Sequence, residues 1–265
     1  MAASPLRGCE GWTMDTMTMT QTNPPLAVQG LSVAYNGKVV LSDVDTVVPE
    51  GAMLAIVGPN GAGKSTFLKA TLGLVPTLSG RVRFFGKSFG DVRRRIAYVP
   101  QRASVDWDFP TSAFGVVMMG FYGRLGLLRP AGRREKARAL ECLERVGLGD
   151  VAARQIGQLS GGQQQRVFLA RALAQDAELI IMDEPFAGVD AATESAIVEV
   201  LKGLRAGGRT VVCVHHDLST VPAYFTHVLL LNGSKIADGP VDQAFTSENL
   251  NIAYGGRLAT PAGVC

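Results

Sequence analysis

The amino-acid sequence predicts an α/β fold: a core sheet of parallel strands, an N-terminal antiparallel β region and an inserted α-helical subdomain. Three observations lead to this prediction. Short apolar or β-branched runs recur along the chain, and several are continuous, as in strands that are covered on both faces. A glycine-rich segment, GPNGAGKST at 58–66, stands between one such run and a helical pattern. In the stretch from 102 to 158, helical patterns replace the recurring strand-like runs.

Composition is that of an ordinary soluble globular protein. The chain has 265 residues, of which 47% are hydrophobic and 18% charged, so it can bury a substantial core. The net charge of +3 is too small to indicate nucleic acid, and no nucleic-acid partner is expected. The 4 cysteines form no CxxC pair and predict neither disulfides nor a zinc site. No apolar run reaches the roughly 18 residues of a membrane span, so a membrane role would need a partner chain.

The first 24 residues have neither helical nor strand periodicity and lack the layout of a signal peptide. We therefore expect a disordered N-terminal tail over 1–24. Three methionines in this tail are candidate start sites: Met14, Met17 and Met19. Their neighbours are Thr and Asp, without His or Cys, which does not favour a binding segment for a soft metal ion. One domain is expected over 25–250, with its helical subdomain at about 102–160, followed by a C-terminal tail over 251–265.

Strand patterns come first in the domain. We expect strands over 26–35 and 38–48, joined by a hairpin turn at Asn36-Gly37. A third strand, MLAIVG, ends at Gly58, and a helix is expected over 64–74. The later runs that predict strands are RVRFFG (81–86), RIAYVPQ (95–101), LIIMDEP (179–185), TVVCVHH (210–216) and HVLLLNG (227–233).

The helical subdomain contains an amphipathic helix at 134–148. Its apolar positions Ala137, Leu140, Leu143 and Val146 recur at helical spacing and define its apolar face.

The segment 58–66 has the pattern of a phosphate-binding loop. Gly61 and Gly63 let successive N–H groups and the helix N-terminus face the phosphates of a nucleotide. Lys64 reaches the β and γ oxygens, and Ser65 coordinates magnesium. The nucleotide-binding residues predicted here are Gly58, Pro59, Asn60, Gly61, Ala62, Gly63, Lys64, Ser65 and Thr66.

Polar side chains end two further strands. Asp183 and Glu184 follow a buried apolar run and would meet the ligand-binding edge of the sheet. Asp183 is suited to the magnesium shell, and Glu184 to polarising the attacking water. The amide of Gln101 can ligate the magnesium or the water. An Asp-Glu pair can also be a solvated strand end, but a neighbouring phosphate loop favours the functional interpretation.

The segment LSGGQQQR at 159–166 looks like half of an anion site. Ser160 is a natural N-cap, and Gly161 and Gly162 let a phosphate approach the start of a helix that continues through Gln163. Because Lys64 already serves the phosphates within one chain, we expect this half to close over the γ-phosphate held by a second copy. The alternative is a turn before an amphipathic helix.

Together these motifs resemble an ATP-binding cassette (ABC) ATPase, a P-loop NTPase, over residues 26 to about 245. The resemblance implies ATP with Mg²⁺, hydrolysis, and a head-to-tail homodimer. It also implies that Tyr35 stacks on adenine and that the AGVD segment (187–190) links the two sites. Of the two histidines that end TVVCVHH, it selects His216 to face the γ-phosphate. His227 is expected to pack or to be solvated.

A narrower resemblance is to the ATPase subunits of manganese, zinc or iron importers. YVPQRASVDWDFP (98–110), HHDLSTVPAYF (215–225) and ENLNIAYGGRL (248–258) carry it. It implies membrane permease partners, an extracytoplasmic metal-binding protein, and a peripheral location at the cytoplasmic face of the cell membrane. Gly115, where an acidic residue is usual, and the Met-rich tail depart from the pattern and concern the identity of the cargo.

In such importers the helical subdomain receives a cytoplasmic helix of the permease. The expected apolar wall is Trp107, Phe109, Met118 and Met119, with Asp106 and Asp108 on its rim. The alternative is that these are core or loop residues. The two carboxylates are not expected to bind metal, because neither His nor Cys accompanies them. The basic runs at 92–95 and 129–138 are expected to be solvated; the alternative is contact with anionic lipid head groups.

The function that the sequence predicts is ATP binding and hydrolysis that energises import of a divalent metal ion such as manganese, zinc or chelated iron. One alternative is a soluble ABC ATPase that remodels a nucleoprotein complex, although such proteins usually carry tandem cassettes or coiled-coil insertions. Another is a regulatory nucleotide-binding module without turnover, which Glu184 and His216 argue against.

Overall fold

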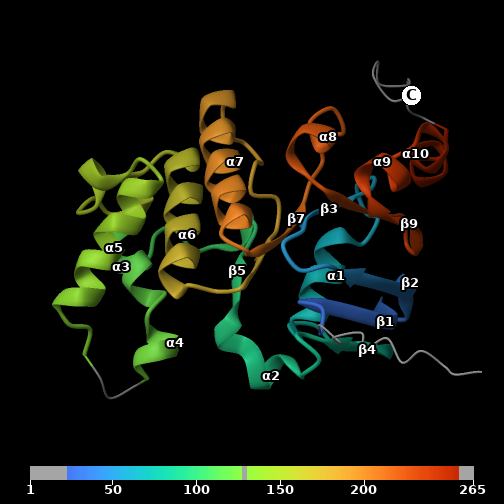
Figure 1. Ribbon diagram of the computed structural model, residues 1–265, viewed down its shortest axis with the longest axis horizontal. Helices are drawn as coiled ribbons and strands as arrows, with labels where there is room; N and C mark the ends of the chain where they lie inside the picture. The colour runs from blue at the N-terminus through green and yellow to red at the C-terminus, as the bar shows by residue number, and fades with distance from the viewer. Residues whose placement is uncertain (1–22, 127–129, 257–265) are drawn as a thin grey trace, which may run out of the picture.

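Two β-sheets and a layer of helices make up the chain (Figure 1). The computed structural model describes residues 23–126 and 130–256. The expectations for 1–22, including the three methionine start sites, lie outside the described residues. Of the residues assigned to the tail, Asn23 is exposed, but Pro24 is half-buried and its O atom accepts a hydrogen bond of 3.0 Å from Phe85 N.

The smaller sheet is the predicted antiparallel region. It has the order β2-β1-β4, formed by β1 (Leu26–Tyr35), β2 (Lys38–Val48) and β4 (Ser79–Arg83). Tyr35 pairs with Lys38 across the two-residue turn, where Asn36 and Gly37 have φ of 49° and 79°. Positive φ at both positions is typical of a type I′ hairpin turn, which an Asn-Gly pair favours.

The larger sheet has the order β5-β6-β7-β3-β8-β9. All neighbours are parallel except the antiparallel pair β8-β9. Its strands are β3 (Met53–Val57), β5 (Ile96–Val99), β6 (Leu179–Met182), β7 (Thr210–Val214), β8 (His227–Leu231) and β9 (Lys235–Pro240). The apolar runs predict every strand but β9, whose sequence KIADGP is half-buried throughout and has no strand periodicity.

Strand β3 shows why continuous apolar runs predict this sheet. Ala55 and Val57 belong to the hydrophobic cluster shared with the helical layer. Leu54 and Ile56 belong to a second cluster, shared with the antiparallel sheet and with α1 (Lys64–Thr71). Because alternate residues point to opposite faces, a strand covered on both faces must be apolar at every position. Helix α1 ends before the expected 74, since Gly73 has φ of 68°.

The helical layer contains α3 (Ala113–Met119), α4 (Tyr122–Leu125), α5 (Arg133–Arg145) and α6 (Gly161–Gln175). It lies to one side of the sheets (Figure 1). The long helix α6 begins at the expected boundary of the helical subdomain at about 160 and packs against α3, α5 and strand β5 of the larger sheet. The remaining long helix, α7 (Ala191–Ala206), lies beside α6 and packs on β7 (Figure 1).

The predicted apolar face of α5 is partly wrong. Leu143 and Val146 are buried, but Ala137 and Leu140 are exposed. The buried stripe instead includes Ala139, Cys142 and Leu143. The sequence of α5 contains two overlapping apolar stripes that share Leu143, so its pattern alone does not decide which stripe is buried. In the structure, the small and sulfur-containing side chains of the second stripe pack against α3 and α6.

Short helical turns connect these elements. They are α2 (Phe89–Val92), η1 (Arg93–Arg95), η2 (Arg102–Ser104), η3 (Gly149–Val151), η4 (Ile156–Gln158), α8 (Val221–Tyr224), α9 (Val241–Ala244) and α10 (Ser247–Tyr254). Helix α10 corrects the expected start of the C-terminal tail at 251, because it continues to Tyr254 and buries Leu250 and Ala253. Among the described residues, no helix has both the length and the apolar character needed to cross a bilayer.

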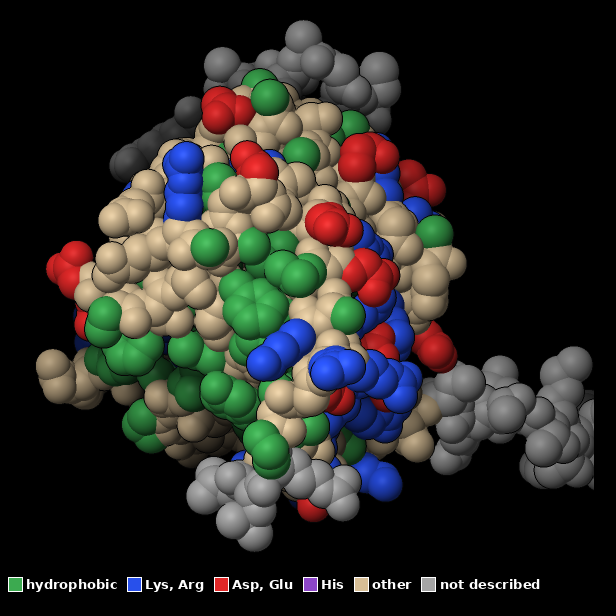
Figure 2. Space-filling model, turned by 90° about the vertical axis from the view of Figure 1, so that its left-hand side faces the viewer, with side chains coloured by type: hydrophobic (Ala, Val, Ile, Leu, Met, Phe, Trp, Pro, Cys, Tyr) green, Lys and Arg blue, Asp and Glu red, His purple; other side chains and the backbone are tan. Residues whose placement is uncertain are grey.

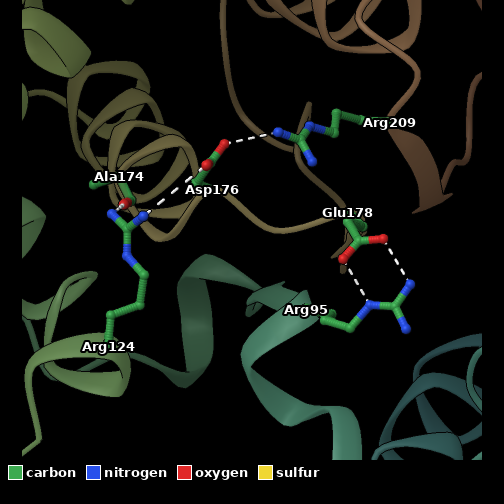
Figure 3. A network of polar contacts seen from close by, with 6 residues as sticks. All are labelled: Arg95, Arg124, Ala174, Asp176, Glu178 and Arg209. Carbon is green, nitrogen blue, oxygen red and sulfur yellow. Dashed lines mark hydrogen bonds and ion pairs between the residues drawn. The ribbon is translucent and has the colours of Figure 1, made fainter.

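Ion pairs flank the connection between α6 and β6 (Figure 3). Asp176, the C-cap of α6, accepts a hydrogen bond of 2.8 Å from Arg209, and Arg124 donates to Ala174 O at 3.1 Å. Arg95 makes two hydrogen bonds of 2.6 Å to the carboxylate of Glu178. Arg95 therefore departs from the expectation that the basic run at 92–95 is solvated. These side chains are partly exposed, so each pair contributes only about 1 kcal/mol or less.

Candidate nucleotide site

A cavity of about 400 Å³ lies where the antiparallel sheet meets the start of α1. Its lining joins segments that are far apart in the chain: Tyr35, Val40, Asn60, Gly61, Ala62, Gly63, Lys64, Ser65, Thr66 and Glu184. All but Val40 are residues that the sequence singles out. Val40 carries no sequence signal, because a β-branched residue inside a strand is ordinary. Gly58 and Pro59 belong to the same loop but do not line the cavity.

The phosphate-binding loop depends on glycine at two positions where the chain packs closely. A Cβ atom at Gly58 would lie 2.0 Å from the carbonyl oxygen of Leu231 in β8. Gly63 has φ of 92°, and a Cβ there would lie 2.6 Å from Leu41 Cδ2. These contacts set the loop directly against β2 and the end of β8, where the chain leaves room only for glycine.

Lys64 lies inside its own loop. Its ammonium donates hydrogen bonds to Gly58 O at 2.8 Å and to Pro59 O at 3.0 Å, and the residue is only 7% exposed. Burial lowers the pKa of Lys64, while the carboxylates of Glu184 and Asp183 oppose that shift. The loop thus holds a cation whose present partners are weak neutral acceptors, which an anionic ligand can replace.

Asp183 and Ser65 form a second polar centre. Ser65 Oγ donates a hydrogen bond of 2.9 Å to Asp183 Oδ1. Asp183 is fully buried, and its Oδ2 atom has no hydrogen-bond partner. Burial raises the pKa of Asp183, which the hydrogen bond from Ser65 counteracts. A buried carboxylate oxygen without a donor beside a hydroxyl is a donor set that suits a hard divalent cation such as Mg²⁺.

Glu184 is held in a strained position at the end of β6. Its φ of 52° is unusual for a residue other than glycine and is typical of functional sites. Gln101 Nε2 donates a hydrogen bond of 2.8 Å to Glu184 Oε2. The structure therefore brings Gln101 to Glu184, and no described contact joins it to Asp183 or Ser65.

The two histidines after β7 have opposite environments. His216 is exposed, whereas His215 is buried and its Nε2 lies 2.7 Å from Thr220 Oγ1. Burial, and then the neighbouring His216, lower the pKa of His215 to about 4. His227 is half-buried at the start of β8, where its Nδ1 lies 3.0 Å from Thr226 Oγ1.

The LSGGQ segment starts helix α6 with a capping box. Ser160 Oγ accepts a hydrogen bond of 3.3 Å from Gln163 N, and Gln163 Oε1 accepts one of 2.9 Å from Ser160 N. A Cβ at Gly162 would lie 3.0 Å from Thr193 in the first turn of α7, which Asp190 of the AGVD segment caps. None of Ser160, Gly161, Gly162 and Gln163 lines the cavity beside Lys64.

A separate, largely apolar cavity of about 190 Å³ opens in the helical layer. Of the residues expected there, Asp106, Trp107, Phe109 and Met119 line it. Asp108 does not line it, and neither does Met118, which points into the core. Adjacent helical residues differ by about 100° in direction, so only one of the two methionines of α3 can face outward. Figure 2 views the molecule from the side of the helical layer and shows apolar side chains gathered beside Arg and Lys.

Known proteins are similar to this chain in both sequence and fold. The ABC transporter family matches residues 41–187. The zinc transport system ATP-binding protein TroB of Treponema pallidum (strain Nichols) is 61% identical over 233 residues, which cover 88% of each chain. The manganese transport system ATP-binding protein MntB of Bacillus subtilis (strain 168) is 57% identical over 234 residues, covering 88% of this chain and 94% of the relative.

Solved structures agree with these relatives. An ATP-binding cassette of an ABC transporter in its ADP conformation matches with a TM-score of 0.70 and 27% identity, over 81% of this chain and 90% of that chain. The cbiO1 protein of Clostridium perfringens, part of an ABC transporter complex, matches with a TM-score of 0.72 and 27% identity, over 89% and 96% of the two chains.

Proposed function

Since the chain belongs to the ABC transporter family as one of its ATPase subunits, we propose that it hydrolyses ATP with Mg²⁺ to drive import of a divalent metal ion through a membrane permease. The cargo is manganese or zinc, which the names of the relatives TroB and MntB indicate. The chain lies at the cytoplasmic face of the membrane, and an extracytoplasmic protein delivers the metal. The similarity to transport subunits leaves remodelling of a nucleoprotein complex without support.

The nucleotide binds in the cavity beside α1. Tyr35 stacks on the adenine ring, and the loop from Gly58 to Thr66 wraps the phosphates. Lys64 exchanges the carbonyl oxygens of Gly58 and Pro59 for phosphate oxygens, which as anions are stronger acceptors. Ser65 and Asp183 hold the Mg²⁺ ion, which neutralises charge on the phosphates when bound.

Glu184 accepts a proton from the attacking water. Gln101 already donates to one oxygen of this carboxylate, which leaves the other oxygen to orient the water. His216, the exposed histidine, contacts the γ-phosphate from the end of β7. These three side chains come from the ends of three strands that are adjacent in the order β5-β6-β7, so one edge of the sheet carries the hydrolytic groups.

A second copy of the chain completes each site. The observation that carries this proposal is that the cavity holding Lys64 and Glu184 contains no residue of the LSGGQ segment. That segment ends in a helix N-terminus with two glycines, which is suited to a phosphate. A head-to-tail pair places it over the γ-phosphate of the other copy, so that ATP joins the two chains. ATP therefore favours the closed pair, and hydrolysis reverses the preference.

The permease contacts the cavity in the helical layer. Trp107, Phe109 and Met119 offer an apolar wall, and Phe109 and Met119 are exposed. Asp106 lies at the same cavity and suits a basic residue on the incoming helix. Trp107 Nε1 donates to Arg102 O at 3.0 Å, and Arg102 directly follows Gln101. A shift of the permease helix can thus reach Glu184 through two hydrogen bonds, which the peptide bond between Gln101 and Arg102 connects.

Two measurements test the proposal. In the purified chain, ATPase activity per molecule should rise with protein concentration, because only pairs hydrolyse ATP; an activity that is constant down to strictly monomeric concentrations would contradict the shared site. In cells that lack the chain, manganese or zinc content should fall and should be restored by the wild-type chain but not by Glu184→Gln. Unchanged content of both metals would contradict metal import while leaving the ATPase assignment in place.

A further inference from the structure

His215 makes contacts that the nucleotide site does not use. The residue is 1% exposed, and its Nε2 lies 2.7 Å from Thr220 Oγ1. Its Nδ1 atom is buried without a hydrogen-bond partner. A buried polar ring that is only half satisfied costs stability, so a hydrophobic residue would be the simpler choice for packing.

The contact with Thr220 closes the loop that carries His216. Thr220 Oγ1 donates to Asp217 O at 3.1 Å. The same oxygen is the partner of His215 Nε2, so one hydroxyl joins the imidazole ring to the backbone of Asp217. Asp217 Oδ1 also accepts from Ser219 N at 2.9 Å and from Ser219 Oγ at 2.7 Å. These hydrogen bonds link the residues of the loop from Asp217 to Thr220 to one another. The contact between His215 and Thr220 then anchors the end of this loop to the core.

The other side of the ring contacts the segment after Glu184. Phe186 meets His215 edge to face, with 5.3 Å between ring centroids and 88° between ring planes. Phe186 is itself buried and lies two residues beyond Glu184. Phe225 packs on the same ring at 5.2 Å between centroids. A single side chain therefore touches both the turn that bears Glu184 and the loop that bears His216.

We propose that His215 is a positioning residue for hydrolysis, which sets His216 relative to Glu184 through its hydrogen bond to Thr220 and its contact with Phe186. This inference rests on the proposed function, in which both Glu184 and His216 act at the γ-phosphate. Without the contacts of His215, the loop that carries His216 can take other positions. A smaller fraction of the bound ATP would then contact Glu184 and His216 at the same time. Nucleotide affinity should change little, because the cavity is lined by other residues.

The test uses Thr220→Val, His215→Phe and the double variant. Thr220 is half-exposed and Val has its shape, so Thr220→Val should fold even where His215→Phe does not. We expect kcat to fall about 10- to 100-fold in each single variant with KM nearly unchanged, as for a small misplacement of a catalytic group. The double variant should be no slower than the slower single variant, because each single variant already breaks the hydrogen bond between His215 and Thr220; Thr220→Val also removes the bond to Asp217 O.

Two further variants serve as controls. Thr46→Val replaces a buried threonine whose hydroxyl has no partner, and should keep the wild-type kcat. His215→Gln places a donor at the Nε2 position and should restore part of the activity. A wild-type kcat in Thr220→Val, or effects that multiply in the double variant, would overturn the positioning role. If instead the wild-type chain itself shows no concentration-dependent ATPase activity, the proposed function has failed rather than this inference.

Discussion

Gln101 Nε2 donates a hydrogen bond of 2.8 Å to Glu184 Oε2 and so joins the ends of the neighbouring strands β5 and β6. The contact matters because Glu184 has a left-handed backbone, which alone would be unfavourable. Gln101 is followed by η2 and by the cavity of the helical layer. The same hydrogen bond thus stabilises the strained carboxylate and connects it to the surface proposed for the permease.

Glu184→Gln should separate nucleotide binding from hydrolysis. The new amide can still accept a hydrogen bond from Gln101 through its carbonyl oxygen, so the geometry of the turn is kept while the base is lost. We expect ATP to bind with little change, turnover to fall by at least about 100-fold, and ATP to hold a stable homodimer. Size-exclusion chromatography with light scattering, with and without ATP, measures the dimer.

Glu178→Gln is the matched control for that variant. Glu178 precedes β6, is bonded to Arg95 and lies away from the nucleotide cavity (Figure 3). Its conversion to an amide should leave turnover near the wild-type rate. A Glu184→Gln chain that stays monomeric in ATP would argue against the shared site.

Ser160→Arg should retain nucleotide binding and abolish turnover. A long cation at the start of α6 would block the phosphate of the partner's ATP, while the cavity of the same chain remains intact. Ser160→Ala removes only the capping bond to Gln163 N and should cost about 1 kcal/mol of stability. Ser112→Ala removes the equivalent cap of α3 and controls for that loss. ATPase activity that survives Ser160→Arg would exclude a role of this segment across the dimer.

The pH dependence of unfolding should reveal the buried state of His215. Burial lowers its pKa to about 4, against about 6.5 in the unfolded chain. Between these values the unfolded chain binds a proton that the folded chain does not. Titration of His215 alone should therefore lower the free energy of unfolding by up to about 3 kcal/mol as pH drops from 6.5 to 4.

Comparison with His215→Phe isolates this effect from the nearby His216 and Asp217. The free energy of unfolding of the wild type minus that of His215→Phe, measured by urea titration at several pH values, should decrease as pH falls through this window. A difference that is constant from pH 4 to pH 7 would mean that His215 titrates normally.

Gly58→Ala should destabilise the chain through a direct clash. The added Cβ would lie 2.0 Å from Leu231 O, a backbone atom that can move only with β8. We expect a loss of about 1–3 kcal/mol and weaker ATP binding, measured by urea unfolding and nucleotide titration. Gly203→Ala in α7 meets no atom within 4 Å and should stabilise by about 0.5–1 kcal/mol. Equal effects of the two substitutions would show that Gly58 is not closely packed.

Local patterns predict most of the fold and the nucleotide site. The loop from Gly58 to Thr66, the Asn36-Gly37 hairpin and the polar side chains at the ends of β5 and β6 are each predicted from neighbouring residues, whereas the resemblance to a known family selected His216 at the end of β7. Glycine conformations and strand-end positions follow from short-range backbone geometry, so no knowledge of distant contacts is needed. The same reasoning failed at β9, whose pairing with β8 is a tertiary contact rather than a pattern of its own.

Only the tertiary structure decided which side chains face which neighbour. It buried Met118 and exposed Met119, rotated the apolar face of α5 toward Ala139 and Cys142, and placed His215 inside and His216 outside. Residues adjacent in sequence carry nearly the same propensity, and long-range packing alone selects the one that is covered. It also kept the LSGGQ segment out of the cavity beside Lys64, because the helical layer holds α6 by contacts with α3 and α5 that no single motif encodes.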